Sequence, residues 1–401
     1  MSWRKLLFKE LIHFPPKISL TIDEVYDFIP MDVLTGGFKF VKETESKTFN
    51  GSGGAKFGNG DTIFARITPC LENGKIAKVD NLEKSVGFGS TEFFVFRAIK
   101  EVSDPDFIYY LAKSDIIKQP AIKSMVGASG RQRADKGVVE DIEINCPPLL
   151  IQQKIGSILS AYDDLIENNI KRIKLLEKAA QNIYKEWFVN FRFPGYELAK
   201  HQQGFPDEWC MKTIGEIGYV VTGKTPSTTN NNYFGKDIPF IKTPDMHQNV
   251  YMDDVEQYLS NEGADSQRNK FLPKNTVIIS CIGARAGVVA LTSILSQTNQ
   301  QINAIVVSIR EMTFWLYFLC KGLHATIHAI GSSGATMTNV SKGKLENIEV
   351  LVPPETILLT YHKMVEPMFS QVLTLQIQNQ KLKEARDILL PRLMNQTIEV
   401  A

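Results

Sequence analysis

Two long stretches of the chain place hydrophobic residues at alternating spacings of three and four. The spacing slips once in the first stretch, around Asn169, and holds throughout the second. Such spacing is typical of helices that pack along a coiled-coil seam. The pattern therefore predicts one helix from Leu149 to about Trp187 and another within residues 353–401. The predicted seam positions are Ile151, Ile155, Ile158, Tyr162, Leu165, Ile173, Leu176, Ala180, Ile183 and Trp187 in the first helix, and Leu358, Tyr361, Val365, Met368, Val372, Leu375, Asn379, Leu382, Arg386, Leu389 and Leu393 in the second.

Each predicted helix follows a pair of prolines, Pro147-Pro148 or Pro353-Pro354. Pro148 suits the first turn of a helix, where a missing N–H costs nothing. Asn169 and Asn379 fall at matching seam positions, and a buried Asn pair fixes the register of a coiled coil at some cost in stability. We expect the two helices to pack on each other, antiparallel, because each otherwise leaves its apolar stripe uncovered. The alternative is that each helix packs on its own domain.

The proline pairs belong to a longer internal repeat. The segment DIEI at 141–144 is echoed by NIEV at 347–350, before the second pair. Further upstream, VGASG at 126–130 matches IGSSG at 330–334, and DTIFA at 61–65 matches NTVII at 275–279. The offset of roughly 205 to 215 residues is too long for a solenoid or propeller unit. Each copy is instead a domain followed by a helix. Two such copies suit a target that has two separated parts.

The globular part of each copy has the mixed pattern of an α+β fold. In the first copy, residues 62–65 and 93–96 have strand patterns, glycine-rich segments predict turns, and residues 107–123 predict a helix. We predict an α+β protein with a pseudo-two-fold internal repeat. Its parts are a first domain at 1–147, a central helix at 148–190, a polar linker rich in Pro and Gly at 191–208, a second domain at 209–352 and a C-terminal helix at 353–401.

Composition narrows the class of protein. The chain has 401 residues, of which 43% are hydrophobic, as expected for two or three globular domains. Because it has neither an apolar run of membrane-spanning length nor a signal-peptide pattern, we expect a cytoplasmic protein without a membrane partner. The five cysteines are scattered, which argues against disulfides and against a metal site. With a formal net charge of +1, any binding to DNA would need local basic patches or a partner subunit.

The predicted helices have a geometric consequence. A helix of about forty residues is roughly 60 Å long. Two such helices, packed antiparallel, would hold the two domains apart and relate them by an approximate two-fold axis. One turn of B-DNA is about 34 Å, so two DNA-binding domains held in this way would contact grooves about one turn or slightly more apart. We therefore expect a bipartite DNA target with a spacer of fixed length and two halves that can differ.

Several motifs resemble those of the specificity subunit of type I restriction–modification systems. The second copy opens with FPDEW at 205–209, IGEI at 214–217 and TGKTPS at 222–227, like a target recognition domain. The segments PFI at 239–241, TNQQI at 298–302 and ARDILLPRL at 385–393 also fit. The first copy fits less closely at its start, where ISLTIDEV at 18–25 is a loose echo of the second opening, and GSTEF at 89–93 is a better match. The resemblance covers essentially the whole chain.

The resemblance implies two target recognition domains separated by the two long antiparallel helices. Each domain would read one half of a split sequence in double-stranded DNA. The helices would set the spacer and dock two methyltransferase subunits, and restriction/translocase subunits would join the same assembly. S-adenosylmethionine, ATP and magnesium would be bound by those partner subunits, so the chain itself would hold no cofactor and would catalyse nothing.

Candidate DNA-binding residues follow from chemistry and position. Bases are read by Arg, Lys, Asn and Gln, and phosphates are bound by Lys, Arg, Ser, Thr and backbone N–H groups. In the first domain the best cluster is the Gly-flanked loop at 129–133. The candidates are Lys56, Arg66, Lys75, Ser129, Arg131, Gln132 and Arg133 in the first domain, and Lys242, Thr243, Arg285, Asn299, Gln300, Gln301, Ser332, Ser333 and Thr336 in the second.

Two other classes of function fit parts of the sequence. Residues 218–225, GYVVTGKT, satisfy the P-loop pattern of nucleotide-binding proteins, but Pro226 and a run of turn-forming residues follow where a phosphate-binding helix would have to begin. We therefore do not expect a nucleotide site. The near-neutral charge also leaves open a protein-binding adaptor that uses its helices as the recognition surface and does not contact DNA.

Overall fold

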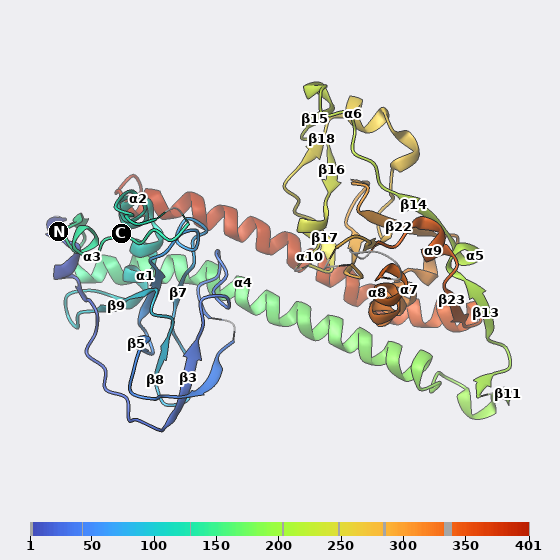
Figure 1. Cartoon of the computed structure of the whole chain (residues 1–401), viewed down its shortest axis with the longest axis horizontal. Helices are drawn as coiled ribbons and strands as arrows, with labels where there is room; N and C mark the ends of the chain where they lie inside the picture. Colours follow the sequence, from blue (N-terminus) through green and yellow to red (C-terminus); the bar gives the residue numbers. More distant parts are fainter. Residues whose placement is uncertain are drawn as a thin grey trace. The chain divides into compact units, whose positions relative to one another are not determined.

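The computed structural model describes residues 3–41, 43–128, 130–202, 204–247, 249–283, 286–332 and 339–400 (Figure 1). The chain divides into two compact units. The first consists of Met1–Glu167 and Lys381–Ala401, and the second of Asn168–Gln380. The division falls inside the two long helices, whereas the boundaries predicted from sequence stand at the starts of the helices. Each unit therefore contains a globular part and a part of each long helix.

The two long helices, α4 (Leu149–Tyr184) and α10 (Glu355–Met394), begin directly after the proline pairs. The Pro148 carbonyl accepts hydrogen bonds from the backbone N–H groups of Ile151 at 2.9 Å and Gln152 at 3.0 Å. The Pro354 carbonyl does the same in α10, with two bonds of 3.1 Å. Each second proline thus caps its helix one position before the first helical residue, which is slightly earlier than the first-turn position that the sequence predicts.

The first unit is built on two sheets and a short two-stranded ribbon. In the described residues, one four-stranded sheet has the order β2-β9-β6-β7, the other has the order β4-β3-β8-β5, and β1 pairs with β10. The strands are β1 Arg4–Leu7, β2 Ile12–His13, β3 Val25–Ile29, β4 Glu45–Thr48, β5 Ala55–Gly58, β6 Thr62–Ala65, β7 Ile76–Lys78, β8 Val86–Gly89, β9 Phe93–Ala98 and β10 Glu143–Cys146.

The single helix predicted at 107–123 is wrong in one respect, because the structure has two helices there. Helix α1 (Pro105–Lys113) is capped by the Asp104 carboxylate, which accepts from the N–H groups of Asp106 and Phe107. Ser114 then takes an extended conformation and starts α2 (Asp115–Lys123). A third helix, α3 (Lys136–Glu140), precedes β10.

The second unit repeats this plan. Its strands in the order β14-β22-β19-β20 correspond to β2-β9-β6-β7, with β17 added at the edge, and the pair β13-β23 corresponds to β1-β10. The elements are β11 His201–Gln202, β12 Phe205–Pro206, β13 Cys210–Thr213, α5 Ile214–Ile217, β14 Gly218–Thr222, β15 Phe234–Gly235, β16 Ile238–Ile241, β17 Tyr251–Met252, β18 Tyr258–Leu259, α6 Asn261–Asp265, β19 Val277–Ser280, β20 Val289–Thr292, β21 Gln297–Thr298, β22 Ile302–Val307, α7 Thr313–Gly322, α8 His324–Ser332, α9 Lys342–Glu346 and β23 Glu349–Val352.

Each unit also has a second sheet that contains one parallel strand pair. In the first unit β3 runs parallel to β8, and in the second β16 runs parallel to β21. The motifs GSTEF and TNQQI begin at the last residues of β8 and β21, and they end at the first residues of β9 and β22. The internal repeat read from the sequence is therefore present in the strand order, and the mixed helix and strand content confirms the α+β class.

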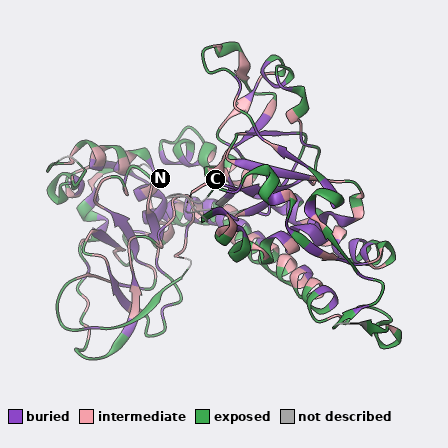
Figure 2. Cartoon of the chain, turned by 45° about the vertical axis from the view of Figure 1, so that its right-hand side comes forward, coloured by how far each residue is buried: buried purple, intermediate pink, exposed green. Residues whose placement is uncertain are grey.

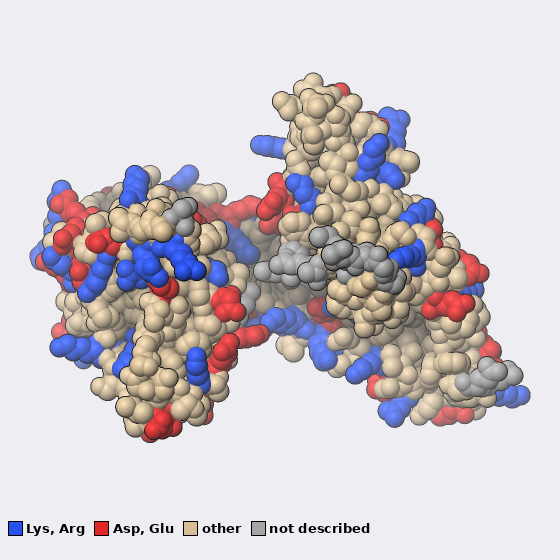
Figure 3. All heavy atoms as spheres, in the orientation of Figure 1, with Lys and Arg blue, Asp and Glu red and all other residues tan. Residues whose placement is uncertain are grey.

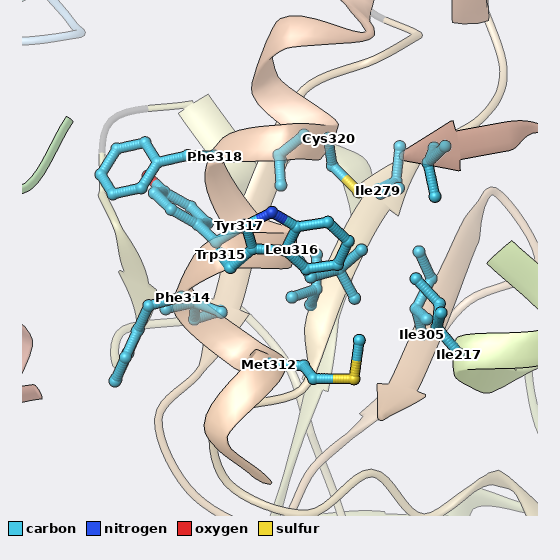
Figure 4. Packing of buried hydrophobic residues seen from close by; sticks show 14 of the residues in the cluster. Ile217, Ile279, Ile305, Met312, Phe314, Trp315, Leu316, Tyr317, Phe318 and Cys320 are labelled. Carbon is cyan, nitrogen blue, oxygen red and sulfur yellow. The ribbon is translucent and has the colours of Figure 1, made fainter. Parts of the chain in front are cut away.

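The hydrophobic cores lie between the sheets and the helices, and the strands are largely buried (Figure 2). In the second unit α7 packs on the sheet, and Figure 4 shows Trp315 and Leu316 beside Ile279 of β19 and Ile305 of β22. Residues of α10, including Tyr361 and Val365, belong to the same cluster. In the first unit Ile155 and Leu159 of α4 share a core with Leu390 and Leu393 of α10.

Helices α4 and α10 are antiparallel within each unit. In the second unit Asn169 contacts Asn379, whereas Ala180, eleven residues later in α4, accepts a bond of 3.4 Å from the earlier residue Tyr361. In the first unit Asp163 pairs with Arg386. The helices thus pack on each other as predicted, and their seam residues also join the domain cores. Among the described residues, none of the helices is both long and apolar enough to cross a bilayer.

Candidate nucleic-acid interface

The loop at 126–133 in the first unit is anchored at its base and exposed at its tip. Val126 and Arg133 form an antiparallel bridge, with N–H to O distances of 3.0 and 3.1 Å. The Gln132 carbonyl accepts from the N–H and hydroxyl of Thr68 at 3.0 and 3.2 Å. Gly127 and Gly130 have φ angles of 132° and 78°, which favour glycine. The loop therefore projects the exposed Arg131 from a fixed base.

Arg133 is held by an acidic partner that the sequence interpretation did not select. Its Nε donates to the two Glu92 carboxylate oxygens at 3.1 and 2.8 Å, and its Nη2 donates to Oε1 at 2.6 Å. The Arg133 guanidinium, by this hydrogen bond, holds the pKa of the Glu92 carboxyl below its usual value, although partial burial acts in the opposite direction. Glu92 is therefore ionised at neutral pH, and the pair carries one charge of each sign.

Arg66 lies next to this pair. Its backbone N–H donates to the Glu92 carbonyl at 2.9 Å, and its guanidinium sits over the Phe94 ring at 4.5 Å. One guanidinium nitrogen also donates to the Ala134 carbonyl at 3.3 Å. Arg66 is half-buried, so much of its side chain belongs to the domain framework. The structure nevertheless brings Arg66, Gln132 and Arg133 together at one edge of the sheet.

Lys56 and Lys75 have separate environments. The Lys75 ammonium donates to the Met31 carbonyl at 2.8 Å, and the Lys56 ammonium lies 4.9 Å from the centre of the Phe49 ring. Both side chains are half-buried. None of these contacts links either lysine to the loop at 126–133. On the first unit as drawn in Figure 3, Lys and Arg side chains gather on the upper part of the visible face, with Asp and Glu among them.

In the second unit the structure brings two predicted groups together. Because β16 and β21 are parallel and pair Ile241 with Thr298, the residues that follow both strands meet at one edge. The Thr243 hydroxyl donates to the Gln301 side-chain oxygen at 3.0 Å, and the Asn299 amide donates to the same oxygen at 3.3 Å. Thr243, Asn299 and Gln301 therefore form one polar cluster, and Lys242 and Gln300 are their neighbours in the chain.

Thr225 joins this cluster although the sequence interpretation did not select it. Its hydroxyl donates to the Gln300 side-chain oxygen at 2.8 Å. The preceding Gly223 lies so close to the chain that a Cβ at this position would overlap the Asn299 carbonyl and the Thr298 hydroxyl. A glycine is therefore required at this position of the TGKTPS motif, which passes close to the end of β21. The resemblance of that motif to the family was the signal in the sequence that pointed to this segment.

The same geometry excludes the P-loop interpretation. Residues 218–222 form β14, and residues 223–227 continue without helical structure. The Lys224 backbone is tied to the cluster instead, since its N–H donates to the Thr298 carbonyl at 2.9 Å and its carbonyl accepts from Gln267 at 2.8 Å. No helix N-terminus follows Lys224 in this described segment, so the amide cradle that holds phosphate in a P-loop is missing.

The other predicted site residues lie at the end of α8, outside the described residues or in the seam of the two long helices. Ser332 is exposed at the end of α8. Ser129, Arg285, Ser333 and Thr336 lie outside the described residues. The two register candidates, Asn169 and Asn379, are brought together in the buried seam of the second unit, where the Asn169 amide donates to the Asn379 oxygen at 3.0 Å.

Comparison with known proteins identifies the family. The family described as "Type I restriction modification DNA specificity domain" matches residues 15–178 and again 206–386. The chain is 30% identical to the HindI specificity subunit of Haemophilus influenzae over 91% of this chain and 92% of that protein. It is 26% identical to the MjaIX specificity subunit of Methanocaldococcus jannaschii, over 72% of this chain and 68% of that protein.

A solved structure supports the fold. The type I restriction–modification S subunit from M. genitalium superposes with a TM-score of 0.62 at 16% identity, covering 98% of this chain and 96% of that one. At this identity the likeness concerns the fold alone. The two family matches, which together span most of the chain, and the full-length relative at 30% identity show that this chain belongs to the specificity subunits of type I restriction–modification systems.

Proposed function

We propose that the chain recognises a bipartite sequence in double-stranded DNA and directs methylation and restriction to it, without catalysing either reaction. The observation that carries this proposal is a duplicated scaffold with different chemistry at equivalent edges. The first unit presents the charged pair of Glu92 and Arg133, and the second presents the amides of Asn299, Gln300 and Gln301. Because base edges are distinguished by their patterns of donors and acceptors, two such edges suit two different half-sites.

The helices would provide both the spacer and the docking surface for partners. α4 has 36 residues and α10 has 40, so they are roughly 54 and 60 Å long at 1.5 Å per residue. Each helix contributes residues to both compact units. We propose that two methyltransferase subunits bind along these helices, that restriction/translocase subunits join the complex, and that the partners bind S-adenosylmethionine, ATP and magnesium.

A domain exchange tests the proposal. Residues 1–147 would be replaced by the corresponding domain of another specificity subunit, and the chain would be produced with its methyltransferase subunit. Sequencing of methylated genomic DNA then gives the modified motif. We expect one half of the motif to change while the other half and the spacer stay the same. A change in both halves would contradict modular recognition, and an absence of any bipartite motif with the natural chain would favour the adaptor function.

A further inference from the structure

We propose that Glu92 is a positioning residue that orients the Arg133 guanidinium to read a guanine in the half-site of the first unit. This inference rests on the proposed function, since it assigns a base to one of the two recognition edges.

The contacts leave one edge of the guanidinium available. Glu92 occupies Nε and one side of Nη2, with oxygen distances from 2.6 to 3.1 Å. A guanidinium has five N–H groups, so both N–H groups of Nη1 and the second of Nη2 remain. Within the described part of the chain, Glu92 is the one acceptor that the Arg133 side chain contacts. Two parallel donors of this kind match the O6 and N7 acceptors of guanine in the major groove.

Both residues are anchored through their backbones. Arg133 lies in bridges to Val126 and to Ile67, on either side of it. The Glu92 carbonyl accepts from Arg66 at 2.9 Å, and the Glu92 N–H donates to the Ser90 hydroxyl at 3.2 Å. The Arg133 side chain is still 46% exposed, so its free edge is accessible. The carboxylate therefore fixes the guanidinium before DNA arrives, which lowers the entropy lost on binding.

The strand register identifies the equivalent residues of the second unit. Ala65 pairs with Phe93 in the first unit as Ser280 pairs with Ile302 in the second, so Glu92 corresponds to Gln301. This register corrects by one residue the sequence match of 61–65 with 275–279, which would have made Ala65 equivalent to Ile279. The Ile67–Arg133 bridge likewise corresponds to the Ile282–Asn339 bridge. The duplicated scaffold thus places a carboxylate and a guanidinium in one unit where it places two amides in the other. Asn and Gln match adenine, whereas Arg matches guanine.

A second ion pair, more exposed than that of Glu92 and Arg133, separates the loss of a surface charge from the loss of base reading. In the first unit Lys5 and Glu143 form such a pair at 2.7 Å, with both side chains more than half exposed. That pair joins β1 to β10 and offers a matched control for the loss of a surface charge.

The test measures discrimination between bases. The full chain with its methyltransferase subunit would be assayed in competition between duplexes carrying the natural half-site and duplexes substituted at one base pair. Arg133→Lys keeps the positive charge but removes the two parallel N–H donors. We expect the preference for one G·C pair of the first half-site to fall roughly 5- to 150-fold. Glu92→Gln should lose part of the same preference. Glu143→Gln should leave it unchanged.

The outcomes separate this inference from the proposed function. Because each result is a ratio between two duplexes, a general loss of affinity does not mimic it, and a thermal melt of each variant reports folding. The inference is overturned if the first half-site contains no G·C pair, or if Arg133→Lys and Arg133→Ala keep the natural preference. If the natural chain methylates no bipartite sequence at all, the proposed function fails instead.

Discussion

The side-chain amide of Asn169 on α4 donates a hydrogen bond of 3.0 Å to the side-chain oxygen of Asn379 on α10. Both residues are buried, with 1% and 7% of their surface exposed. Their neighbours along the seam, including Leu176 and Leu375, are apolar. Within the described residues the Asn169 oxygen has no hydrogen-bond partner, so the pair does not satisfy all of its polar atoms. Such a pair favours one alignment of two helices at the expense of stability.

Replacing one member of this pair should cost more than replacing both. Asn169→Leu leaves the buried Asn379 side-chain oxygen without its donor, and we expect it to lower the free energy of unfolding by about 1–3 kcal/mol. The double variant with Asn379→Leu should recover most of that loss. Urea unfolding of the single and double variants measures the coupling, with the exposed Asn182→Leu on α4 as control. If the loss in the double variant equals the sum of the losses in the two single variants, the two residues are not coupled.

Arg386 should be among the most sensitive residues of the first unit. Its guanidinium pairs with the Asp163 carboxylate, both side chains are only 2% exposed, and Tyr110 donates to the same carboxylate at 2.6 Å. Arg386→Met would leave a buried carboxylate without its cation, which costs about 3–5 kcal/mol. The exposed pair of Arg268 and Asp265 is the control, since Arg268→Met should leave stability nearly unchanged. Equal effects in thermal or urea unfolding would refute this assignment.

Lys113 should make stability depend on pH in the alkaline range. Burial lowers the pKa of its ammonium from 10.5 to about 8. Between these values the unfolded chain binds the proton and the folded chain does not, so the contribution of Lys113 to stability falls as the pH drops from about 10.5 to 8. Lys113→Met removes that penalty and should stabilise the protein by about 1–3 kcal/mol at pH 7.

The measurement is the difference in unfolding free energy between Lys113→Met and the natural chain at several pH values. The difference should be largest below pH 8 and should shrink towards pH 10.5. Lys171→Met, which changes an exposed lysine of α4, should show no such trend. A constant difference across this range would mean that Lys113 is protonated in the folded protein throughout.

Lengthening both helices together should lengthen the spacer of the DNA target. One heptad inserted after Glu167 and one after Gln380, where the compact units divide, would leave the contact between Asn169 and Asn379 unchanged. Seven helical residues add roughly 10 Å, or about three base pairs at 34 Å per turn. Sequencing of methylated DNA should therefore show the same two halves around a longer spacer. The same heptad inserted after the exposed Leu198, outside the two long helices, should leave the spacer and both halves unchanged. An unchanged spacer in the DNA target of the lengthened variant would show that the helices do not set the spacer length.

The sequence by itself determined the features that depend on local or periodic patterns. The seam spacing located α4 and α10, the proline pairs marked their starts within a residue, and the repeated motifs revealed the duplicated α+β plan. It also placed Asn169 and Asn379 at matching seam positions, because a helical period relates position in the chain to position on a face.

Tertiary structure alone decided which distant side chains meet. Glu92 and Arg133 are 41 residues apart and come together through the pairing of β6 with β9 and the bridge at Ile67. Thr225 reaches Gln300 because Gly223 allows two chain segments to approach closely. Strand register and backbone packing govern both contacts. Neither contact can be predicted from the spacing of residues along a single segment. The sequence could therefore nominate Arg133 and Gln300, but not the partners that fix their orientation.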